Sequence, residues 1–297
     1  MSTSENGTRG APIAFVEHRV ARDHSDLYVR EYAGKGPAFV TLHGFPDNLH
    51  IFDDVVPHLV AAGRRVVTFD FLGFGASSKP AGYPYSFEKQ LGELKAVADA
   101  LSLDRIIPVA HDAGGPTGVN FALQYPKRTE YVCLLNCFYG SAPTLRLPEF
   151  IEVFASKTLR ALSQHFLQSP EQFAWLLNFQ RTQFQQGLTE AQGEHYKTFL
   201  GPAIDQNFRQ KPSAAPAFAR MTSQAFDEVA RNDGRIDELK RSKVPFRLIW
   251  GDIDPYLNKG VAEDLASKIS TATTTFLRAG HWPQIDLPRD TARAMLA

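Results

Sequence analysis

The sequence predicts an α/β protein with about eight mostly parallel strands flanked by helices. Short apolar runs typical of strands alternate with helical patterns up to about residue 138, and this alternation resumes at residue 245. Such alternation is typical of parallel sheets that are covered by helices on both faces. Between residues 141 and 241 helical spacing continues without a strand run. We therefore expect a helical insertion after the sixth strand.

Each expected strand is a short apolar run bounded by turn residues. The first two runs are close enough in sequence to form a hairpin, and a helical pattern covers residues 87–101. The runs lie at residues 15–20, 27–32, 38–42, 65–69, 106–109, 131–135, 246–250 and 274–277.

The chain is expected to divide into a core domain and a cap. Residues 1–138 form the first part of the core, of which 1–12 are expected to be flexible, and residues 242–297 complete it. Residues 139–241 form a helical cap that is rich in phenylalanine. Most of these rings must pack the cap itself, because aromatic residues at helical spacing usually belong to a core. The others would line a closed apolar pocket, which suits a small uncharged organic substrate.

Composition restricts the class of partner. Lys and Arg number 32 and Asp and Glu also number 32, so no net charge attracts nucleic acid or an anionic membrane. No apolar run is long enough to span a bilayer, and the polar N-terminal residues lack the apolar part of a signal peptide. We therefore expect a cytoplasmic protein, and the sequence leaves open whether it is a monomer or a homodimer.

Cysteine and histidine usage predicts neither a disulfide nor a cofactor. Cys133 and Cys137 fall in one expected strand, where their Cα atoms would be roughly 13 Å apart, beyond the reach of a disulfide. The nine histidines include no HExxH pair and no Cys/His cluster, so no metal is expected. Nothing in the sequence is similar to a dinucleotide-binding loop or a Walker motif.

Asp112 is the candidate nucleophile. It lies in the segment Val-Ala-His-Asp-Ala-Gly-Gly, between the expected strand at 106–109 and a helix that begins near Gly114. A sharp strand-to-helix turn strains its central residue and needs small neighbours such as Ala110 and Gly114. Aspartate tolerates a positive φ better than most residues. The alternative is that Asp112 only caps the following helix.

Two further segments follow strands in the same way. Asp254 ends the turn Gly-Asp-Ile-Asp after the strand at 246–250, and His281 follows the strand at 274–277. The order along the chain is then nucleophile, acid and histidine, which is the order of the α/β-hydrolase triad.

With this triad the chain resembles the α/β-hydrolase superfamily over nearly its whole length, apart from the insertion. The aspartate makes it similar to the branch of epoxide hydrolases and haloalkane dehalogenases. This resemblance implies an α/β-hydrolase fold and a triad of Asp112, Asp254 and His281. It also favours Asp254 over Asp252 as the acid, because the family places the acid fourth in a Gly-x-x-Asp turn. Asn136 ends the sixth strand, where some relatives carry the acid, and is set aside because it cannot ionise.

A fourth motif is similar to the HGxP signature of that branch. It reads His43-Gly44-Phe45-Pro46 and follows the strand at 38–42. The resemblance implies that the backbone N–H groups of Phe45 and Ala113 form an oxyanion hole, and that the Phe45–Pro46 peptide bond is cis. We interpret His43 as a structural histidine that fixes its own loop.

The carboxylate indicates the mechanism. Attack of Asp112 on an sp³ carbon would give a neutral ester, whereas attack on an ester or amide would give an unproductive anhydride. His281, oriented by Asp254, would then deprotonate a water molecule that attacks this ester, with Phe45 and Ala113 stabilising the oxyanion. Small organic substrate and water are thus the only expected ligands.

Three functions remain possible, and the residues that would hold the leaving group distinguish the two catalytic ones. In epoxide hydrolases, phenols from the cap hold the epoxide oxygen, and Tyr196 is the main candidate, with Tyr139 second. In dehalogenases a tryptophan follows the nucleophile and an asparagine or a cap tryptophan assists it. Here Ala113 and Phe45 stand in two of those places, and Trp175 is the remaining candidate. We expect an epoxide hydrolase, with a haloalkane dehalogenase and then a non-catalytic binding protein of the same fold as alternatives.

Overall fold

The computed structural model describes residues 13–297, so the expectation for residues 1–12 lies outside the described part. Eight strands form one sheet in the order β1-β2-β4-β3-β5-β6-β7-β8. β1 and β2 pair antiparallel, as do β2 and β4, and the remaining neighbours are parallel, as predicted. The strands are β1 (Val16–Arg22), β2 (Ser25–Tyr32), β3 (Lys35–Leu42), β4 (Arg64–Phe69), β5 (Ile106–Asp112), β6 (Val132–Cys137), β7 (Phe246–Gly251) and β8 (Ala272–Leu277).

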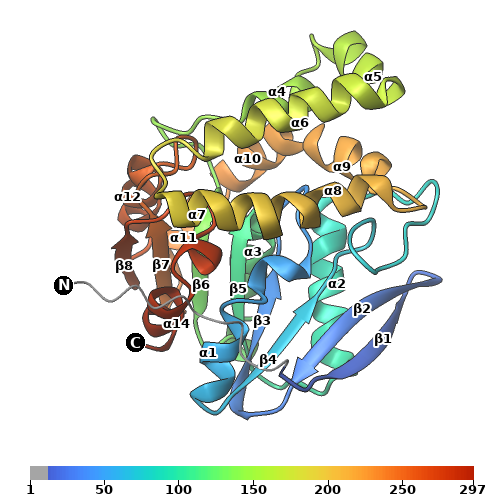
Figure 1. Ribbon diagram of the computed structural model, residues 1–297. Coiled ribbons are helices and arrows are strands. Elements are labelled where there is room, and N and C mark those ends of the chain that lie inside the picture. Colours follow the sequence, from blue (N-terminus) through green and yellow to red (C-terminus); the bar gives the residue numbers. More distant parts are fainter. Residues whose placement is uncertain (1–12) are drawn as a thin grey trace.

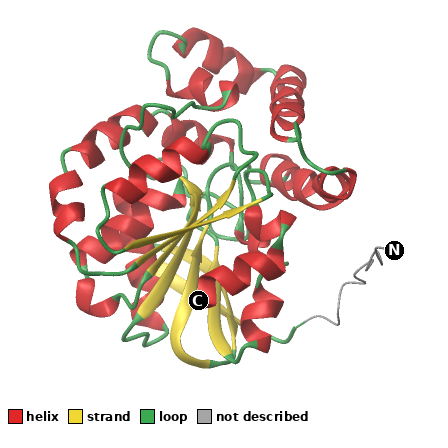
Figure 2. Ribbon diagram, turned by 90° about the vertical axis from the view of Figure 1, so that its left-hand side faces the viewer, coloured by secondary structure: helices red, strands yellow, loops and turns green. Residues whose placement is uncertain are grey.

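Helices cover both faces of the sheet (Figure 2). Successive side chains of a strand point to opposite faces, so a central parallel strand such as β6 must be apolar on both sides. In β6, Val132 and Leu134 join one buried cluster, while Cys133 and Leu135 join the other. The first cluster includes α2 (Phe87–Ala100), α3 (Gly114–Gln124) and α12 (Lys259–Ser267), and the second includes α1 (Val56–Ala61), α13 (Pro283–Asp286) and α14 (Pro288–Leu296). Short 3₁₀ turns are η1 (Leu49–Phe52) and η2 (Pro126–Arg128).

Residues 139–241 contain helices and no strand, in agreement with the predicted insertion. In Figure 1 these helices lie over the end of the sheet at which the parallel strands finish. How far the insertion behaves as a separate cap domain stays a prediction. Its elements are α4 (Glu149–Ala155), α5 (Arg160–Gln168), α6 (Pro170–Phe184), α7 (Glu190–His195), the π-helical turn η3 (Tyr196–Leu200), α8 (Gly201–Arg209), α9 (Ala215–Thr222), α10 (Ala225–Asp233) and α11 (Ile236–Arg241).

Phenylalanine rings form the interior of this helical layer. Phe150 stacks on Phe218 with ring centroids 4.6 Å apart, and Phe154, Phe173 and Phe208 also contact Phe218 through tilted or edge-on rings. Edge-to-face and offset arrangements are the favoured ones for aromatic rings. The cluster holds α4, α6, α8 and α9 together over the sheet.

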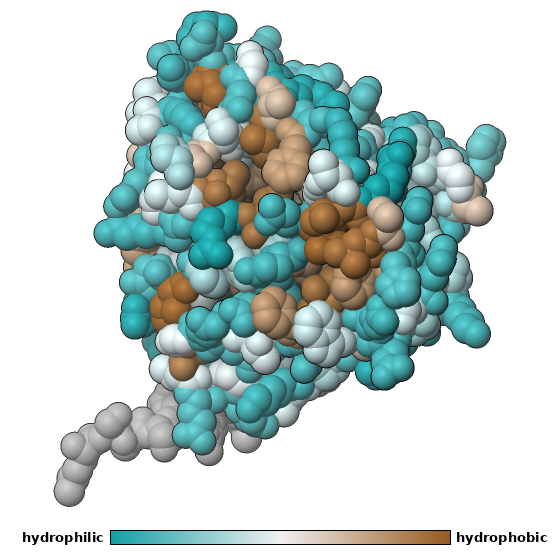
Figure 3. Space-filling model, turned by 90° about the horizontal axis from the view of Figure 1, so that it is seen from above, coloured by the Kyte–Doolittle hydropathy of each residue, from teal (hydrophilic) through white to brown (hydrophobic). Residues whose placement is uncertain are grey.

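Seen from above, the outer surface of the molecule carries hydrophobic patches among hydrophilic residues (Figure 3). Leu159, Leu162, Leu167 and Trp175, on or beside α5 and α6, are between 37% and 62% exposed. Within residues 13–297, no helix is both long and apolar enough to cross a membrane. Cys133 and Cys137 are buried free thiols of β6, as expected.

Candidate active site

Asp112 is the last residue of β5, and α3 begins two residues later at Gly114. Its φ is 49°, in the left-handed region, as the strand-to-helix turn predicts. The turn needs glycine at two contacts: a Cβ on Gly114 would lie 2.5 Å from the carbonyl oxygen of Leu42, and one on Gly44 would lie 2.2 Å from Oδ2 of Asp112. The cap position of α3 is Ala113, and no side chain caps the helix. The alternative in which Asp112 serves only as a helix cap is therefore wrong.

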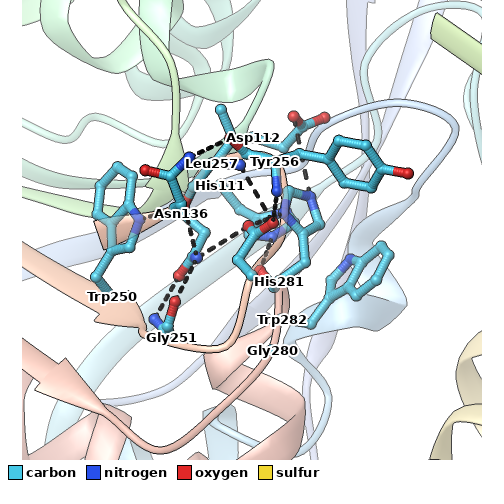
Figure 4. A network of polar contacts seen from close by, with 12 residues as sticks. His111, Asp112, Asn136, Trp250, Gly251, Tyr256, Leu257, Gly280, His281 and Trp282 are labelled. Carbon is cyan, nitrogen blue, oxygen red and sulfur yellow. Dashed lines mark hydrogen bonds and ion pairs between the residues drawn. The ribbon is translucent and has the colours of Figure 1, made fainter. Parts of the chain in front are cut away.

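His281 and Asp254 form a buried hydrogen-bonded pair, and Figure 4 shows His281 within the network of polar contacts that surrounds it. Nδ1 of His281 lies 2.6 Å from Oδ2 of Asp254. The carboxylate accepts, so Nδ1 carries the hydrogen, and Nε2 of the neutral ring is left as the basic nitrogen. Nε2 lies 4.0 Å from Oδ1 of Asp112. The structure thus brings the three expected triad residues together, although they come from three separate loops. Asp252, the reserve acid, lies near Arg278 instead.

Asn136 holds Asp254 in place. Its Nδ2 donates to Oδ2 of Asp254 over 3.0 Å, and its Oδ1 accepts from the backbone N–H of Gly251 over 2.7 Å. The backbone N–H groups of Tyr256 and Leu257 donate to the other carboxylate oxygen. From the sequence, Asn136 was a candidate only for the position of the acid, and this supporting contact was not predicted. One signal for this contact was available: Asn136 lies at the end of the sixth strand, beside the strand that leads to Asp254.

The backbone around the two expected oxyanion donors surrounds the Asp112 carboxylate. The N–H of Phe45 donates to Oδ2 of Asp112 over 3.3 Å, and the backbone of Ala113 also hydrogen-bonds this side chain. The Phe45–Pro46 bond is cis, as expected. His43 donates from Nδ1 to the carbonyl of Gly44 over 2.6 Å and accepts at Nε2 from the N–H of Phe71 over 3.1 Å. Both of its nitrogens are occupied inside its own part of the core, as expected for a structural histidine.

The electrostatics of the triad follow from burial and from its charges. Burial raises the pKa of Asp112 above its ordinary value, and the nearby His281 only partly opposes this shift. Burial also acts to raise the pKa of Asp254, but the charge and hydrogen bond of His281 outweigh it, and the pKa is lowered. For His281 burial acts to lower the pKa, whereas Asp254 and then Asp112 raise it, and the net shift is upward. Asp254 is therefore the group that stays ionised.

A small cavity of about 50 Å³ adjoins the triad. Asp112 and His281 line it from the core, while α4, α6, η3 and α8 supply the opposite wall. Most of the lining is apolar, which suits a carbon skeleton and excludes water from the carboxylate. The lining residues are Phe45, Pro46, Asp47, Asp112, Pro148, Phe150, Ile151, Leu177, Gln180, Arg181, Phe184, Tyr196, Ile204, His281 and Trp282.

Tyr196 is the one expected cap residue that reaches this cavity. It opens the π-helical turn η3, and it is 4% exposed. Its ring lies edge-on to Trp282, with centroids 5.5 Å apart. No group within residues 13–297 hydrogen-bonds its hydroxyl. Burial raises its pKa, so the phenol keeps its proton at neutral pH.

Tyr139 and Trp175 do not line the cavity. The hydroxyl of Tyr139 donates to Oδ1 of Asn120 over 2.9 Å, behind α3, so this tyrosine is part of the core packing. Trp175 is 62% exposed and stacks on Phe179. The buried residues of α6 recur every three or four positions, so they share one face of the helix. Trp175 lies on the opposite, exposed face. The expectation of a leaving-group role for these two residues is therefore corrected.

Sequence reasoning missed a contact between two of the site's loops. Asp47 directly follows the HGFP motif, and its Oδ2 accepts from the indole N–H of Trp282 over 3.0 Å. The same oxygen lies 3.6 Å from Nδ1 of His111, whose Nε2 donates to the backbone carbonyl of His281 over 2.8 Å. Asp47 is 2% exposed. This buried carboxylate therefore joins the loop of the oxyanion donor Phe45 to the loop of the base.

The fold and the site together define an α/β-hydrolase, and comparison with known proteins agrees. The model of the alpha/beta hydrolase fold family matches residues 37–288, and the chain belongs to this family. The chain is 28% identical over 274 residues to haloalkane dehalogenase 2 of Mycobacterium tuberculosis, covering 91% of this chain and 89% of that protein. The crystal structure of haloalkane dehalogenase DbeA from Bradyrhizobium elkani superposes with a TM-score of 0.75 at 21% identity, over 95% of this chain and 96% of that one.

Two other relatives match over shorter stretches. Fluoroacetate dehalogenase of Burkholderia sp. is 36% identical over 141 residues, which are 46% of this chain and 44% of that protein. Bifunctional epoxide hydrolase 2 of Sus scrofa is 36% identical over 121 residues, which are 40% of this chain and 22% of that protein. The matched stretches thus span less than half of either relative. Within residues 13–297, no cluster of histidine, cysteine and acidic side chains could hold a metal ion.

Proposed function

We propose that this hydrolase opens an epoxide to a diol through a covalent ester on Asp112. The observation that carries the proposal is that Tyr196, a buried and protonated phenol, lines the same small cavity as Asp112 and His281. An epoxide needs a carbon-directed nucleophile on one side and a proton donor for its oxygen on the other. The cavity supplies one of each.

In the first step a carboxylate oxygen of Asp112 attacks an epoxide carbon. The carbon–oxygen bond of the ring breaks, its electron pair stays on the oxygen, and that oxygen takes the proton of the Tyr196 hydroxyl. The product is a hydroxyalkyl ester of Asp112. This ester is neutral, and the negative charge now lies on the Tyr196 oxygen until that oxygen regains a proton in the second step.

In the second step His281 takes a proton from water, and the resulting hydroxide attacks the carbonyl carbon of the Asp112 ester. The N–H groups of Phe45 and Ala113 donate to the oxyanion that forms. Collapse breaks the bond to the alkyl oxygen, and the diol leaves with the proton from His281. The proton left over from water restores the Tyr196 phenol, so epoxide plus water gives the diol.

Hydrolysis of a carbon–halogen bond is the second candidate. It is favoured by the similarity to haloalkane dehalogenase 2 over 91% of the chain. It ranks second because the tryptophan N–H groups that could stabilise a departing halide are not available in the cavity. The indole of Trp282 is already bonded to Asp47, and Trp175 faces outward. A non-catalytic binding role is disfavoured because His281 and Asp254 are paired beside Asp112.

The test is a substrate panel with 1,2-epoxyhexane, 1-bromohexane and a p-nitrophenyl ester. Diol formation that falls about 10²-fold in Tyr196→Phe, the scale for loss of a positioned acid, supports the proposal. Tyr139→Phe is the matched control and should retain activity, because its hydroxyl is bonded elsewhere. Halide release without diol formation would move the function to the second candidate. Cleavage of the ester alone would contradict the carboxylate mechanism.

A further inference from the structure

A second hollow lies directly outside the active-site cavity, between α6 and the η3–α8 segment. It measures about 530 Å³ and is open to the surface. Arg181 and Tyr196 line both this groove and the inner cavity, so the two spaces meet at these side chains. The groove is lined by Asn178, Arg181, Thr182, Gln185, Gln186, Tyr196, Lys197, Gly201, Pro202 and Asp205.

Arg181 bridges the helices on either side of the groove. Its guanidinium pairs with Asp205 on α8 and donates to the carbonyl oxygen of Gly201 over 3.2 Å. The side chain is 19% exposed, so it is held in place and still reaches the groove. A substrate that enters the inner cavity from this side must pass Arg181 and Tyr196.

The two spaces differ in chemistry. Most residues that line the inner cavity are apolar, whereas most residues that line the groove carry an amide, hydroxyl or charged group. Arg181 and Lys197 bring two positive charges to the groove, and Asp205 brings one negative charge. Lys197 is exposed and has no ion pair within residues 13–297. The groove therefore has one uncompensated positive charge, on the residue next to Tyr196.

We propose that this groove binds an anionic group, such as a carboxylate, at the far end of the substrate. The uncharged epoxide end then occupies the inner cavity beside Asp112. The planar guanidinium of Arg181 and the free ammonium of Lys197 are the groups that recognise the carboxylate. This inference rests on the proposed epoxide hydrolysis. The sequence predicted an uncharged substrate; under this inference, only the end of the substrate that reacts is uncharged.

The experiment compares two substrates of the same shape, 5,6-epoxyhexanoate and 5,6-epoxyhexanamide. We expect a higher kcat/KM for the carboxylate at low ionic strength, and the preference should shrink as salt is added. Lys197→Gln should lower kcat/KM for the carboxylate about two- to five-fold, the scale of one exposed ion pair, and leave the amide unchanged. Asp205→Asn should act in the opposite direction, because it removes the anion that competes for Arg181.

Lys157→Gln is the matched control, since Lys157 is 80% exposed and lies outside the groove. It should change neither substrate. Equal turnover of both epoxides, unaffected by Lys197→Gln, would overturn the inference and leave the proposed function standing. A preference for the amide would overturn it as well. Absence of diol from both epoxides would overturn the proposed function itself, and the inference with it.

Discussion

Nε2 of His281 lies 4.0 Å from Oδ1 of Asp112, close enough to interact electrostatically but beyond hydrogen-bonding distance. The carboxylate oxygen is therefore not tied to the base and stays available for attack. Asp112 is also one of the groups that raise the pKa of His281. Formation of an ester on Asp112 would move the negative charge to Tyr196 and end the contribution of Asp112 to the raised pKa of His281, which favours the neutral imidazole that the second step needs.

The first prediction follows from the separate roles proposed for Asp112, as nucleophile, and His281, as base. His281→Gln should still be alkylated on Asp112 by a true epoxide substrate, and hydrolysis of the ester should then stop, because no base activates water. Mass spectrometry should show the variant heavier by one substrate, with the added mass on the peptide that contains Asp112. Asp112→Asn should gain no mass. In the wild type, one turnover in H₂¹⁸O should label the Asp112 carboxylate; label in the diol alone would mean that water attacks the epoxide directly.

The second prediction concerns pH and Asp47. Alkylation needs ionised Asp112, whose pKa burial raises, so its rate should fall as pH drops through that raised value. The charge of Asp47 also raises the pKa values of Asp112 and His281. Asp47→Asn keeps an oxygen for the Trp282 indole and removes the charge. The acidic limb of the single-turnover alkylation rate should therefore move to lower pH, and an unchanged limb would contradict the coupling.

The third prediction tests the packing around the nucleophile. In Gly44→Ala the new Cβ would meet Oδ2 of Asp112 at 2.2 Å, so the carboxylate or the Phe45 loop must shift. A misplacement of this size should lower kcat/KM by about 10²-fold. Gly193→Ala is the control, because its nearest neighbouring atom is 3.9 Å away and its helical site favours alanine. Retained activity in Gly44→Ala would show that the close approach is not required.

The fourth prediction concerns stability. Glu93 is buried on α2, and burial raises its pKa from 4.5 to about 8, although the N–H of Leu72 and the hydroxyl of Tyr83 donate to it. Between these two values the folded state holds a proton that the unfolded state has released. Stability should therefore fall as pH rises through this window. Glu93→Gln should raise the free energy of unfolding at pH 7 by about 2 kcal/mol. Denaturant titrations at pH 5 and pH 7 measure this, and a variant with the same pH slope as the wild type would refute it.

The positions of the strands and the candidate triad residues could be predicted because their signals are local. Asp112 ends the buried strand β5, Asp254 follows the buried strand β7, and His281 follows the edge strand β8. Parallel strands end at the same edge of a sheet, so residues that follow them are brought together whatever their separation in sequence. The sequence by itself therefore determined the fold class, the turn that carries Asp112 and the approach of the other two residues.

Only the tertiary structure decided which further residues meet this edge. The sequence ranked Tyr196 before Tyr139 for an epoxide and offered Trp175 for a halide, but only packing shows where each lies. Tyr196 lines the cavity, Tyr139 bonds to Asn120 and Trp175 faces outward. The contact between Asp47 and Trp282 joins residues 235 positions apart. No periodicity encodes such pairings, because they depend on how whole loops and helices pack against one another. The sequence thus specified the candidate nucleophile Asp112 and the candidate base His281, whereas long-range packing selected the residues that line the cavity beside them.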